Sequence, residues 1–402
     1  MAGPLSHIRV LDLSRIMAGP WASQVLADLG ADVIKVERPG VGDDTRAWGP
    51  PFLKDKSGAD TRESGYYLSV NRGKRSIALD LDKPEGQRVV RKLAERSDIV
   101  LENFKAGTLK RFGLDYESLK AINPRLIYCS ITGFGQTGPK RDAPAYDFMI
   151  QAMGGLMSVT GEADGKPGGG PQKVGVPITD LMTGMYAAVS VLAALAQREV
   201  SGRGDFIDLA MLDVQVGYLA NQAMNFLVSG KPPRRSGNAH PNIQPQDVFA
   251  CRDGHMALAV GNDGQFEKFC TAVGHAEWAQ DPRFIKNADR VCNREALTAL
   301  IADALAQGAV RDWVSRIETA GVPCAVINPV PGALEEEQIK HRAMLRHLPH
   351  PLAGSVPQVV SPMRFKETPL SFDRPPPLLG EHTDEILREL GLDLSEPRRT
   401  GS

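Results

Sequence analysis

Residues 8–37 read IRVLDLSRIMAGPWASQVLADLGADVIKVE, and this stretch decides the fold. The runs Ile8–Leu13 and Asp32–Glu37 are rich in strand-forming residues, and the segment 21–30 between them has helical spacing. A strand, a helix and a second strand in this order predict a parallel sheet with a right-handed crossover. The first turn carries only Gly19, followed by Pro20, so the G-x-G-x-x-G fingerprint of dinucleotide-binding folds is missing.

The same pattern repeats further along the chain. Strands are predicted at Ser76–Leu81, Asp98–Phe104 and Leu126–Ile131, and a helix at Pro84–Ser97 begins with proline. The fold class is therefore α/β with an open, mostly parallel sheet. Basic residues recur at the strand ends: Arg38, Lys74, Arg75, Lys105 and Arg111. If these ends line one crevice, a polyphosphate ligand meets several cations there; the alternative is ordinary solvated surface charge.

The length of 402 residues, 42% of them hydrophobic, favours two domains. Proline, glycine and polar residues crowd together over 229–246, which places a domain boundary there. We expect the first part of a large α/β domain at 1–228, a small α+β domain at 229–330, and a C-terminal part at 331–402 that packs back on the large domain. Single helices are expected over 145–161 and 212–228, and hairpin strands within 357–365.

Composition excludes several classes of protein. The net charge is −1, which argues against a general nucleic-acid or membrane-surface binder. The five cysteines include no C-x-x-C pair and the eight histidines no H-x-x-x-H spacing, so neither a disulfide framework nor a metal site is expected. The first 15 residues lack the apolar core of a signal peptide, and we expect a cytoplasmic protein.

Residues 174–199, VGVPITDLMTGMYAAVSVLAALAQRE, predict a long apolar helix with Asp180 in its first turn. The apolar run is too short and too sharply bounded for a convincing membrane span. Two interpretations of Asp180 remain open at this point. It is either a helix cap that accepts backbone N–H bonds, or a carboxylate nucleophile flanked by small residues that leave room for a substrate.

Eight motifs in order, spread over nearly the whole chain, carry a resemblance to a known family: the run from Leu11 to Arg46, NRGKRSIALDL, ENFKAGTLKRFGL, SITGFGQTGP, YDFMIQA with GLMSVTG, PITDLMTG, GRGDFIDLAM and PPPLLGEHTDEIL. The chain resembles the class III CoA-transferases, the group of formyl-CoA transferase and carnitine CoA-transferase. The resemblance implies a Rossmann-like large domain built from both chain ends, an inserted small domain, and two chains interlocked as a homodimer.

The resemblance also implies a site. The catalytic aspartate of the family falls on Asp180, and coenzyme A is the co-substrate, with no metal. Positions that line the CoA site in the family fall on Met17, Ala18, Arg38, Asn71, Arg72, Gly73, Lys74, Asn103, Phe104 and Arg111. For the distal carboxylate of an acceptor acid, Arg46, Arg72 and Arg75 are the candidate cations. His240 either reaches the site or is a loop histidine without a catalytic role.

Departures from the formyl-CoA transferase pattern narrow the range of possible substrates. Formyl-CoA transferases carry Gln where this chain has Met17, and Lys and Tyr where it has Thr132 and Phe134. Their glycine-run loop has no match near 238–246, which argues against formate and oxalate. The chain looks closest to the succinyl-CoA:glutarate CoA-transferase branch, which implies succinyl-CoA as donor and a dicarboxylate such as glutarate as acceptor.

Other functions remain as alternatives. The related α-methylacyl-CoA racemases have a G-H-D triplet where this chain has Ala145-Tyr146-Asp147, so the racemase base is absent. Another acyl-CoA-processing enzyme of this fold or a formyl-CoA:oxalate-type transferase is an alternative within the family. Outside it, the alternatives are a nicotinamide-dependent oxidoreductase, against which the missing glycine fingerprint counts, and a non-catalytic CoA-binding protein.

Overall fold

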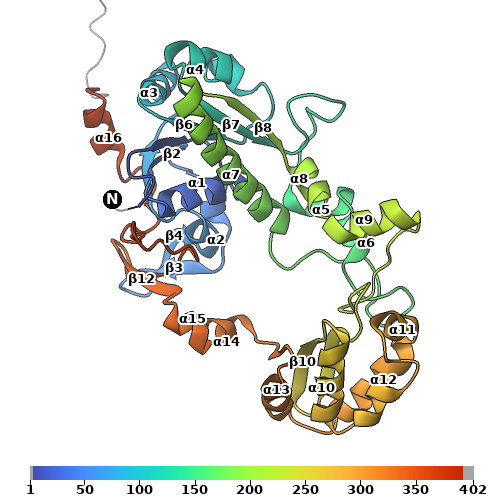
Figure 1. Cartoon of the computed structure of the whole chain (residues 1–402). Helices are drawn as coiled ribbons and strands as arrows, with labels where there is room; N and C mark the ends of the chain where they lie inside the picture. Colours follow the sequence, from blue (N-terminus) through green and yellow to red (C-terminus); the bar gives the residue numbers. More distant parts are fainter. Residues whose placement is uncertain (1–2, 393–402) are drawn as a thin grey trace, which may run out of the picture. The chain divides into compact units, whose positions relative to one another are not determined.

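A computed structural model describes residues 3–392 and divides the chain into two compact units (Figure 1). The first unit joins the chain up to Gly155, Val174–Ala220 and the chain from Gln338 onward. The second joins Leu156–Lys173 and Asn221–Glu337. The glycine-rich segment 156–173 thus groups with the small unit, whereas the sequence placed it in the large domain.

The first unit is built on a six-stranded sheet with the order β5-β2-β1-β6-β7-β8, in which all neighbours are parallel. The strands are β1 (Arg9–Asp12), β2 (Asp32–Glu37), β5 (Lys74–Ala78), β6 (Ile99–Glu102), β7 (Ile127–Thr132) and β8 (Phe206–Ala210). The chain first builds outward on one side of β1 and then returns to build on the other side. The strand order therefore reverses between β1 and β6, which is where open α/β sheets form a crevice at the carboxyl ends of their strands.

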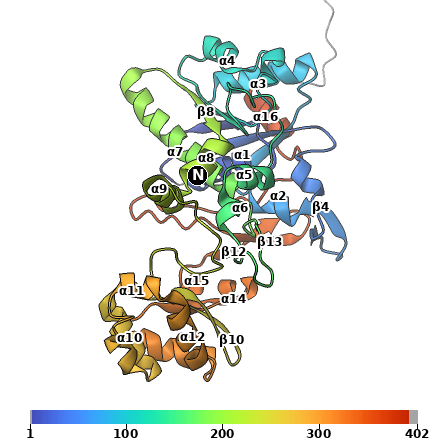
Figure 2. The same ribbon diagram turned by 90° about the vertical axis from the view of Figure 1, so that its right-hand side faces the viewer.

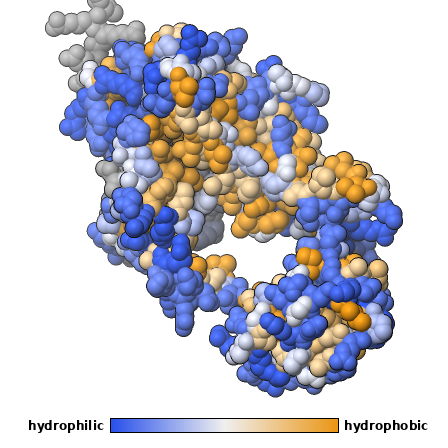
Figure 3. Space-filling view, viewed as in Figure 1, coloured by the Kyte–Doolittle hydropathy of each residue, from blue (hydrophilic) through white to orange (hydrophobic). Residues whose placement is uncertain are grey.

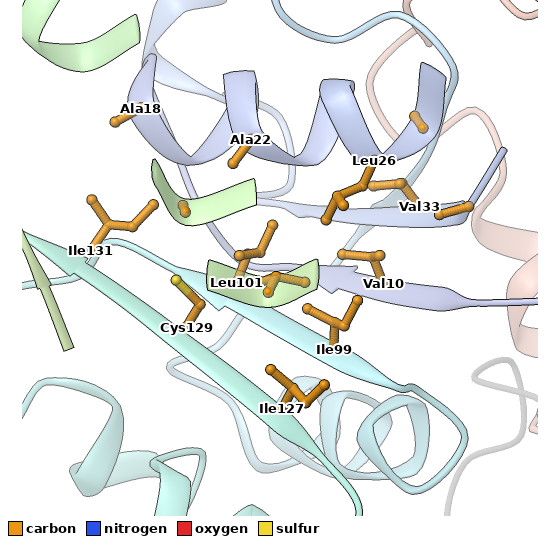
Figure 4. Close-up of a cluster of buried hydrophobic side chains, with 14 of the residues drawn as sticks. Val10, Ala18, Ala22, Leu26, Val33, Ile99, Leu101, Ile127, Cys129 and Ile131 are labelled. Carbon is orange, nitrogen blue, oxygen red and sulfur yellow. The ribbon is translucent and has the colours of Figure 1, made fainter. Parts of the chain in front are cut away.

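Helices cover both faces of this sheet (Figures 1 and 2). On one face, α1 (Ala18–Asp28) and α7 (Ile178–Ser201) pack on Val10, Val33 and Leu101 (Figure 4). On the other face lie α3 (Pro84–Glu95), α4 (Tyr116–Ile122) and α16 (Thr383–Glu389). Because both faces are covered, nearly every residue of β1, β2, β5, β6 and β7 is buried or half-buried.

The helix α7 is long and apolar enough to cross a membrane, judged by length and composition alone. It packs instead along α1, and its Ala187 and Val191 are fully buried in the core. A Cβ atom on Gly184 would lie only 2.6 Å from the main-chain oxygen of Ala18, so the two helices approach too closely for any larger residue there. At its C-terminus, Gly202 ends the helix in a left-handed conformation.

Smaller elements complete the first unit. A hairpin pairs β3 (Phe52–Lys54) with β4 (Asp60–Ser64), and the short helices are η1 (Asp44–Ala47), α2 (Gly65–Ser69), η2 (Leu109–Phe112), α5 (Asp147–Met153) and α8 (Met211–Gly217). A second hairpin pairs β12 (Leu345–His350) with β13 (Gly354–Val359), earlier in the chain than the predicted strands within 357–365. The first hairpin and α2 were not predicted.

The two long helices predicted over 145–161 and 212–228 are wrong. The first is divided into α5 and α6 (Leu156–Val159) at Gly154-Gly155, where Gly155 is left-handed. The second is divided into α8 and α9 (Ala220–Ser229), where Ala220 has a φ of 45° that no helix interior accepts. Local glycine and a single left-handed residue thus override an otherwise continuous apolar pattern.

The second unit is a small α+β structure. Its antiparallel sheet has the order β11-β10-β9, from β9 (Gln246–Cys251), β10 (Gly254–Ala259) and β11 (Cys324–Val326). The helices are α10 (Asp263–Val273), η3 (Ala276–Gln280), α11 (Asn287–Cys292), α12 (Arg294–Leu305), α13 (Val310–Thr319) and α14 (Val330–Glu335), and α15 (Glu337–His341) lies where the chain returns to the first unit. Its separate core includes Phe266, Phe269 and Trp313.

Candidate active site

A cavity of about 240 Å³ lies in the first unit, at the carboxyl ends of β1, β2, β5 and β6. Its lining includes three of the positions predicted for CoA, namely Arg38, Phe104 and Arg111. Within residues 3–392, neither Arg38 nor Arg111 has a carboxylate at ion-pairing distance, so both guanidinium groups are open to an anionic ligand. The lining also contains five carboxylates, so the cavity offers an anion two unpaired arginines rather than a net positive charge.

Arg15 joins this cavity although the sequence did not single it out. Its guanidinium lies 5.4 Å from the centre of the Phe104 ring and pairs with Asp44 at 3.0 Å. The predicted site residue Asn103 fixes the backbone of Arg15 twice, because its Oδ1 accepts from Arg15 N at 2.8 Å and its Nδ2 donates to Arg15 O at 2.7 Å. Asn103 thus holds the loop that delivers Arg15 to the cavity.

The predicted positions Met17 and Ala18 lie where α1 begins, and both are buried. The residue before them, Ile16, has a φ of 72°. At the start of a helix the first backbone N–H groups have no partner inside the helix, so those of Ala18 and Gly19 remain available for a ligand oxygen.

The predicted positions Asn71, Arg72, Gly73 and Lys74 lie apart from this cavity, between α2 and β5. The Lys74 ammonium is fully buried and donates to Asp12, to the main-chain oxygen of Pro20 and to Asn71 Oδ1 at 2.8–3.2 Å. Burial lowers the pKa of Lys74 to about 8. Arg72 pairs with Asp28 at 2.6 Å, and Gly73 is left-handed. The charges of Arg72 and Lys74 are therefore used inside the protein.

The hypothesis that Arg46, Arg72 or Arg75 binds the acceptor carboxylate is not supported. Arg46 contacts Glu37 at 2.8 Å and Glu63 at 2.6 Å, and Arg75 contacts three carboxylates, those of Asp32, Glu385 and Glu389. All three arginines are almost completely buried. An arginine whose donors already face carboxylates has none to offer a substrate without breaking a buried pair.

Asp180 lies in the first turn of α7 but does not cap it. The carboxylate of Asp147 does so instead, since its Oδ2 accepts from the N–H of Thr179 at 2.8 Å and of Asp180 at 3.1 Å. Within residues 3–392 the Asp180 side chain forms no hydrogen bond and no ion pair. Burial, and then the negative charge of Asp147, raise the pKa of Asp180 to about 7. Of the two interpretations of Asp180, the cap is therefore wrong.

The neighbourhood of Asp180 contains further polar groups. Burial and the charges of Asp180 and Asp147 raise the pKa of Tyr66 to about 12, so this phenol stays protonated. Its ring meets that of Trp48 edge-on at 5.0 Å. Asp147 also accepts from Gln151 Nε2 at 2.5 Å. Asp147 stood out in the sequence only as part of motif matches and Tyr66 not at all, because they lie 33 and more than 100 residues from Asp180.

The packing of α7 against α1 fixes where Asp180 lies. Asp180 and Gly184 are four residues apart and therefore share one face of α7, with a rise of about 6 Å between them. Gly184 touches Ala18 at the start of α1. Helix α1 connects β1 to β2, and α7 lies between β7 and β8 in the chain. Because these strands are all parallel, both helices begin at the same edge of the sheet. Asp180 therefore lies beside the first turn of α1.

Comparison with known sequences decides the family. The model of CoA-transferase family III matches residues 5–383. The chain belongs to CoA-transferase family III. Among the relatives of this family III chain, the succinate–glutarate CoA-transferase of Agrobacterium fabrum is 48% identical over 387 residues, 96% of each chain. The succinyl-CoA:glutarate CoA-transferase of Mus musculus is 41% identical, over 96% of this chain and 86% of the relative.

A solved structure agrees with this membership. A CAIB/BAIF family protein from Brucella suis matches 97% of this chain and all of its own, with a TM-score of 0.86 and 48% sequence identity. The predicted α/β fold with a large parallel sheet and the predicted family are thus confirmed. The family III chain is a CoA-transferase, an enzyme class whose co-substrate is coenzyme A. The oxidoreductase and binding-only alternatives are set aside on this ground.

Proposed function

We propose that this enzyme moves CoA from succinyl-CoA to a dicarboxylate such as glutarate, with Asp180 as the nucleophile. Two relatives named for this substrate pair, at 48% and 41% identity over almost the whole chain, support the substrates. One observation supports the nucleophile: Asp180 is a half-buried carboxylate at a helix N-terminus, and no group within residues 3–392 holds it by a hydrogen bond or as a paired cation. A carboxylate in that position is available to attack.

The reaction has four acyl-transfer steps, and in each step one bond to the acyl carbon forms as another breaks. The Asp180 carboxylate attacks the thioester carbonyl of succinyl-CoA, which gives a mixed anhydride and the CoA thiolate. The thiolate attacks the aspartyl carbonyl, which gives an aspartyl-CoA thioester and releases succinate. The acceptor carboxylate attacks this thioester to form a second anhydride and the thiolate again. The thiolate then attacks the acyl carbonyl of the acceptor, which completes the new thioester and regenerates the Asp180 carboxylate.

The surroundings of Asp180 suit these steps. With a pKa of about 7, Asp180 is a stronger base than an ordinary carboxylate and is still substantially ionised at neutral pH. Each attack creates an oxyanion, for which the N–H groups of Ala18 and Gly19 at the start of α1 are candidate donors. One such donor contributes about 3 to 4 kcal/mol in other acyl-transfer enzymes. Asp147 anchors the first turn of α7 through two backbone bonds and so fixes the position of the nucleophile.

The cavity at the strand ends suits the nucleotide part of CoA. Arg38 and Arg111 offer unpaired guanidinium groups to phosphates. The Phe104 ring, flanked by Arg15, offers a face on which an adenine ring stacks. The nucleotide then lies at the ends of β2 and β6, and the pantetheine arm extends along the start of α1 toward Asp180.

We also propose the interlocked homodimer that the family resemblance implies, in the cytoplasm. At the surface of the first unit, α7 exposes Met185, Tyr186 and Val189, and α5 exposes Phe148 and Met149, each by more than a third. Apolar residues gather on this face of the first unit (Figure 3). A contiguous apolar surface of this kind is typical of an interface between subunits. Size measurement by light scattering tests it: a monomer at micromolar concentration contradicts the dimer.

The experiment for the proposed function is CoA transfer from succinyl-CoA to glutarate, mesaconate, citramalate, oxalate and carnitine, with the wild type and Asp180→Asn. Asp142→Asn, an exposed aspartate outside the site, is the matched control. We expect transfer with glutarate that disappears only in Asp180→Asn, together with a CoA adduct on the peptide that contains Asp180 in the wild type. Transfer that survives in Asp180→Asn refutes the nucleophile, and transfer to another acid alone refutes glutarate.

A further inference from the structure

The residue before the start of α1 has a strained backbone. Ile16 has a φ of 72°, in the left-handed region. A β-branched side chain adopts this region rarely and at an energetic cost, because its branches crowd the neighbouring peptide groups. Such a conformation persists only where surrounding contacts impose it, and in enzymes it is concentrated at functional sites.

A buried ion pair imposes this conformation. The Ile16 N–H points at Asp43, 3.3 Å from each carboxylate oxygen. The Lys35 ammonium binds the same carboxylate at 2.9 Å and donates to the main-chain oxygen of Ser14, also at 2.9 Å. The side chains of Lys35 and Asp43 are both fully buried. The pair therefore holds both ends of the segment Ser14–Ile16.

Two groups of the candidate active site lie on this segment or directly after it. Arg15, in its middle, extends into the cavity beside Phe104. Met17 and Ala18, directly after it, begin α1, whose free N–H groups lie beside Asp180. The direction in which the chain leaves Ile16 therefore sets both the nucleotide end and the acyl end of the site.

Stability alone is a weak reason for such a pair. A buried ion pair is often no more stabilising than apolar residues of the same volume, because desolvation offsets the attraction. Asp43 has further roles at the start of η1, where it accepts from Thr45 N at 3.0 Å and Thr45 Oγ1 at 2.8 Å. These bonds do not involve Ile16. A substitution that removes one of them therefore tests the local structural role of Asp43 separately from its role through Ile16.

We propose that Asp43, held by Lys35, is a positioning residue for CoA transfer: it keeps Ile16 left-handed, and Ile16 in turn aims Arg15 and the first turn of α1 at the two ends of the substrate. This inference rests on the proposed function. It adds two buried residues, Lys35 and Asp43, which line the same cavity as Arg15, and whose effect on kcat passes through the backbone conformation of Ile16.

A double-mutant cycle tests it. Asp43→Asn puts an NH2 group, which cannot accept, in place of one of the two oxygens that face the Ile16 N–H. It should lower kcat by about tenfold or more, since a misplacement of about 1 Å costs up to about a hundredfold in other enzymes. Ile16→Gly adopts a positive φ without strain and without help from Asp43, so its own kcat is the reference for the second half of the cycle. In the Ile16→Gly background, Asp43→Asn should then cost less than about threefold, a non-additivity expected only if the two residues act through each other. Thr45→Val, which removes a different bond to Asp43, is the control and should keep kcat within about twofold.

The outcomes separate cleanly. If the wild type transfers CoA and Asp43→Asn has the wild-type kcat, or if the two changes are additive, the inference is wrong. If the wild type transfers no CoA, the proposed function fails first. Asp43→Asn leaves Lys35 without its partner. If this variant does not fold for that reason, the double variant Lys35→Met with Asp43→Asn replaces it, because it leaves no isolated buried charge. In this double variant we expect the same loss of kcat, and the same smaller loss when Ile16→Gly is also present. Equal thermal midpoints of the folded variants show that kcat, not stability, has changed.

Discussion

Replacing Asp147 by Asn should move the acid limb of the pH–rate profile to lower pH. Asp147 is one of the two causes that raise the pKa of Asp180 to about 7, after burial. Asparagine removes the negative charge but keeps an oxygen that accepts the N–H bonds of Thr179 and Asp180, so α7 keeps its cap. The Asp180 carboxylate is then easier to ionise, and its pKa falls.

The size of the shift follows from the geometry. Asp147 Oδ2 lies 3.1 Å from the Asp180 nitrogen, and the Asp180 carboxylate is a few bonds further on. Two unit charges about 6 Å apart, at an effective dielectric constant of about 40, repel by about 1.4 kcal/mol, which is about one pKa unit. At pH 6 a group of pKa 7 is about 10% ionised and one of pKa 6 about 50%, so kcat/KM at this pH should rise about fivefold relative to its plateau.

The assay is kcat/KM for succinyl-CoA at saturating glutarate, from about pH 5.5 to about pH 8.5, with wild type, Asp147→Asn and the surface control Asp142→Asn. The control should reproduce the wild-type limb. An acid limb in Asp147→Asn that stays in place, or moves to higher pH, refutes the reasoning, because then either Asp147 carries no charge that Asp180 senses or Asp180 is not the group that must ionise.

Three further changes test separate parts of the structure. Asp180→Asn should raise the free energy of unfolding above pH 7 by at most about 4 kcal/mol, and by progressively less toward pH 4. The reason is that the pKa of Asp180 in the folded state is raised to about 7, so its ionisation opposes folding only as pH rises. Thermal midpoints measured across pH test this, and equal midpoints for both proteins at all pH values contradict it. Lys74→Met should lower the free energy of unfolding by about 3 to 5 kcal/mol, because it leaves Asp12 buried with one cation fewer. Arg111→Ala should instead weaken CoA binding without changing the thermal midpoint. Calorimetry and CoA titration of both variants check this contrast, and the reverse pattern refutes it. Gly184→Ala should cost about 1 to 3 kcal/mol and lower kcat, because its new methyl group would lie 2.6 Å from the Ala18 oxygen; chemical denaturation and kcat test it, and a neutral effect on both contradicts this contact.

The sheet was readable from the sequence because most of its strands are short runs rich in Val, Ile and Leu. The predicted boundaries of β2 match the observed ones, and β1, β6 and β7 differ by one or two residues. The helices that failed were those whose end depends on one residue. A left-handed Ala220 is not a recognisable stop signal, and the apolar pattern continues through it.

The site was only partly readable, for a physical reason. Arg38 and Arg111 were found because topology brings strand ends together. The same reasoning also selected Lys74 and Arg75, which lie at the start of β5 and face buried carboxylates rather than the crevice. Sequence shows that a residue is charged but not whether a partner distant in the chain neutralises it. For Arg75 those partners come from β2 and α16, the latter more than 300 residues away.

The contrast among carboxylates argues that Asp180 is selected for reaction rather than for structure. Five described carboxylates have a raised pKa, and burial is the first cause for each: Asp28, Glu63, Glu102, Asp180 and Asp247. Asp28 and Glu63 each face an arginine, Glu102 accepts the N–H of Phe104, and Asp247 accepts the N–H of Val248. Each of those four is satisfied where it lies. Asp180 alone among them has no such partner and also has a like charge beside it, an arrangement that costs stability at neutral pH and fits the proposed attack on a substrate carbonyl.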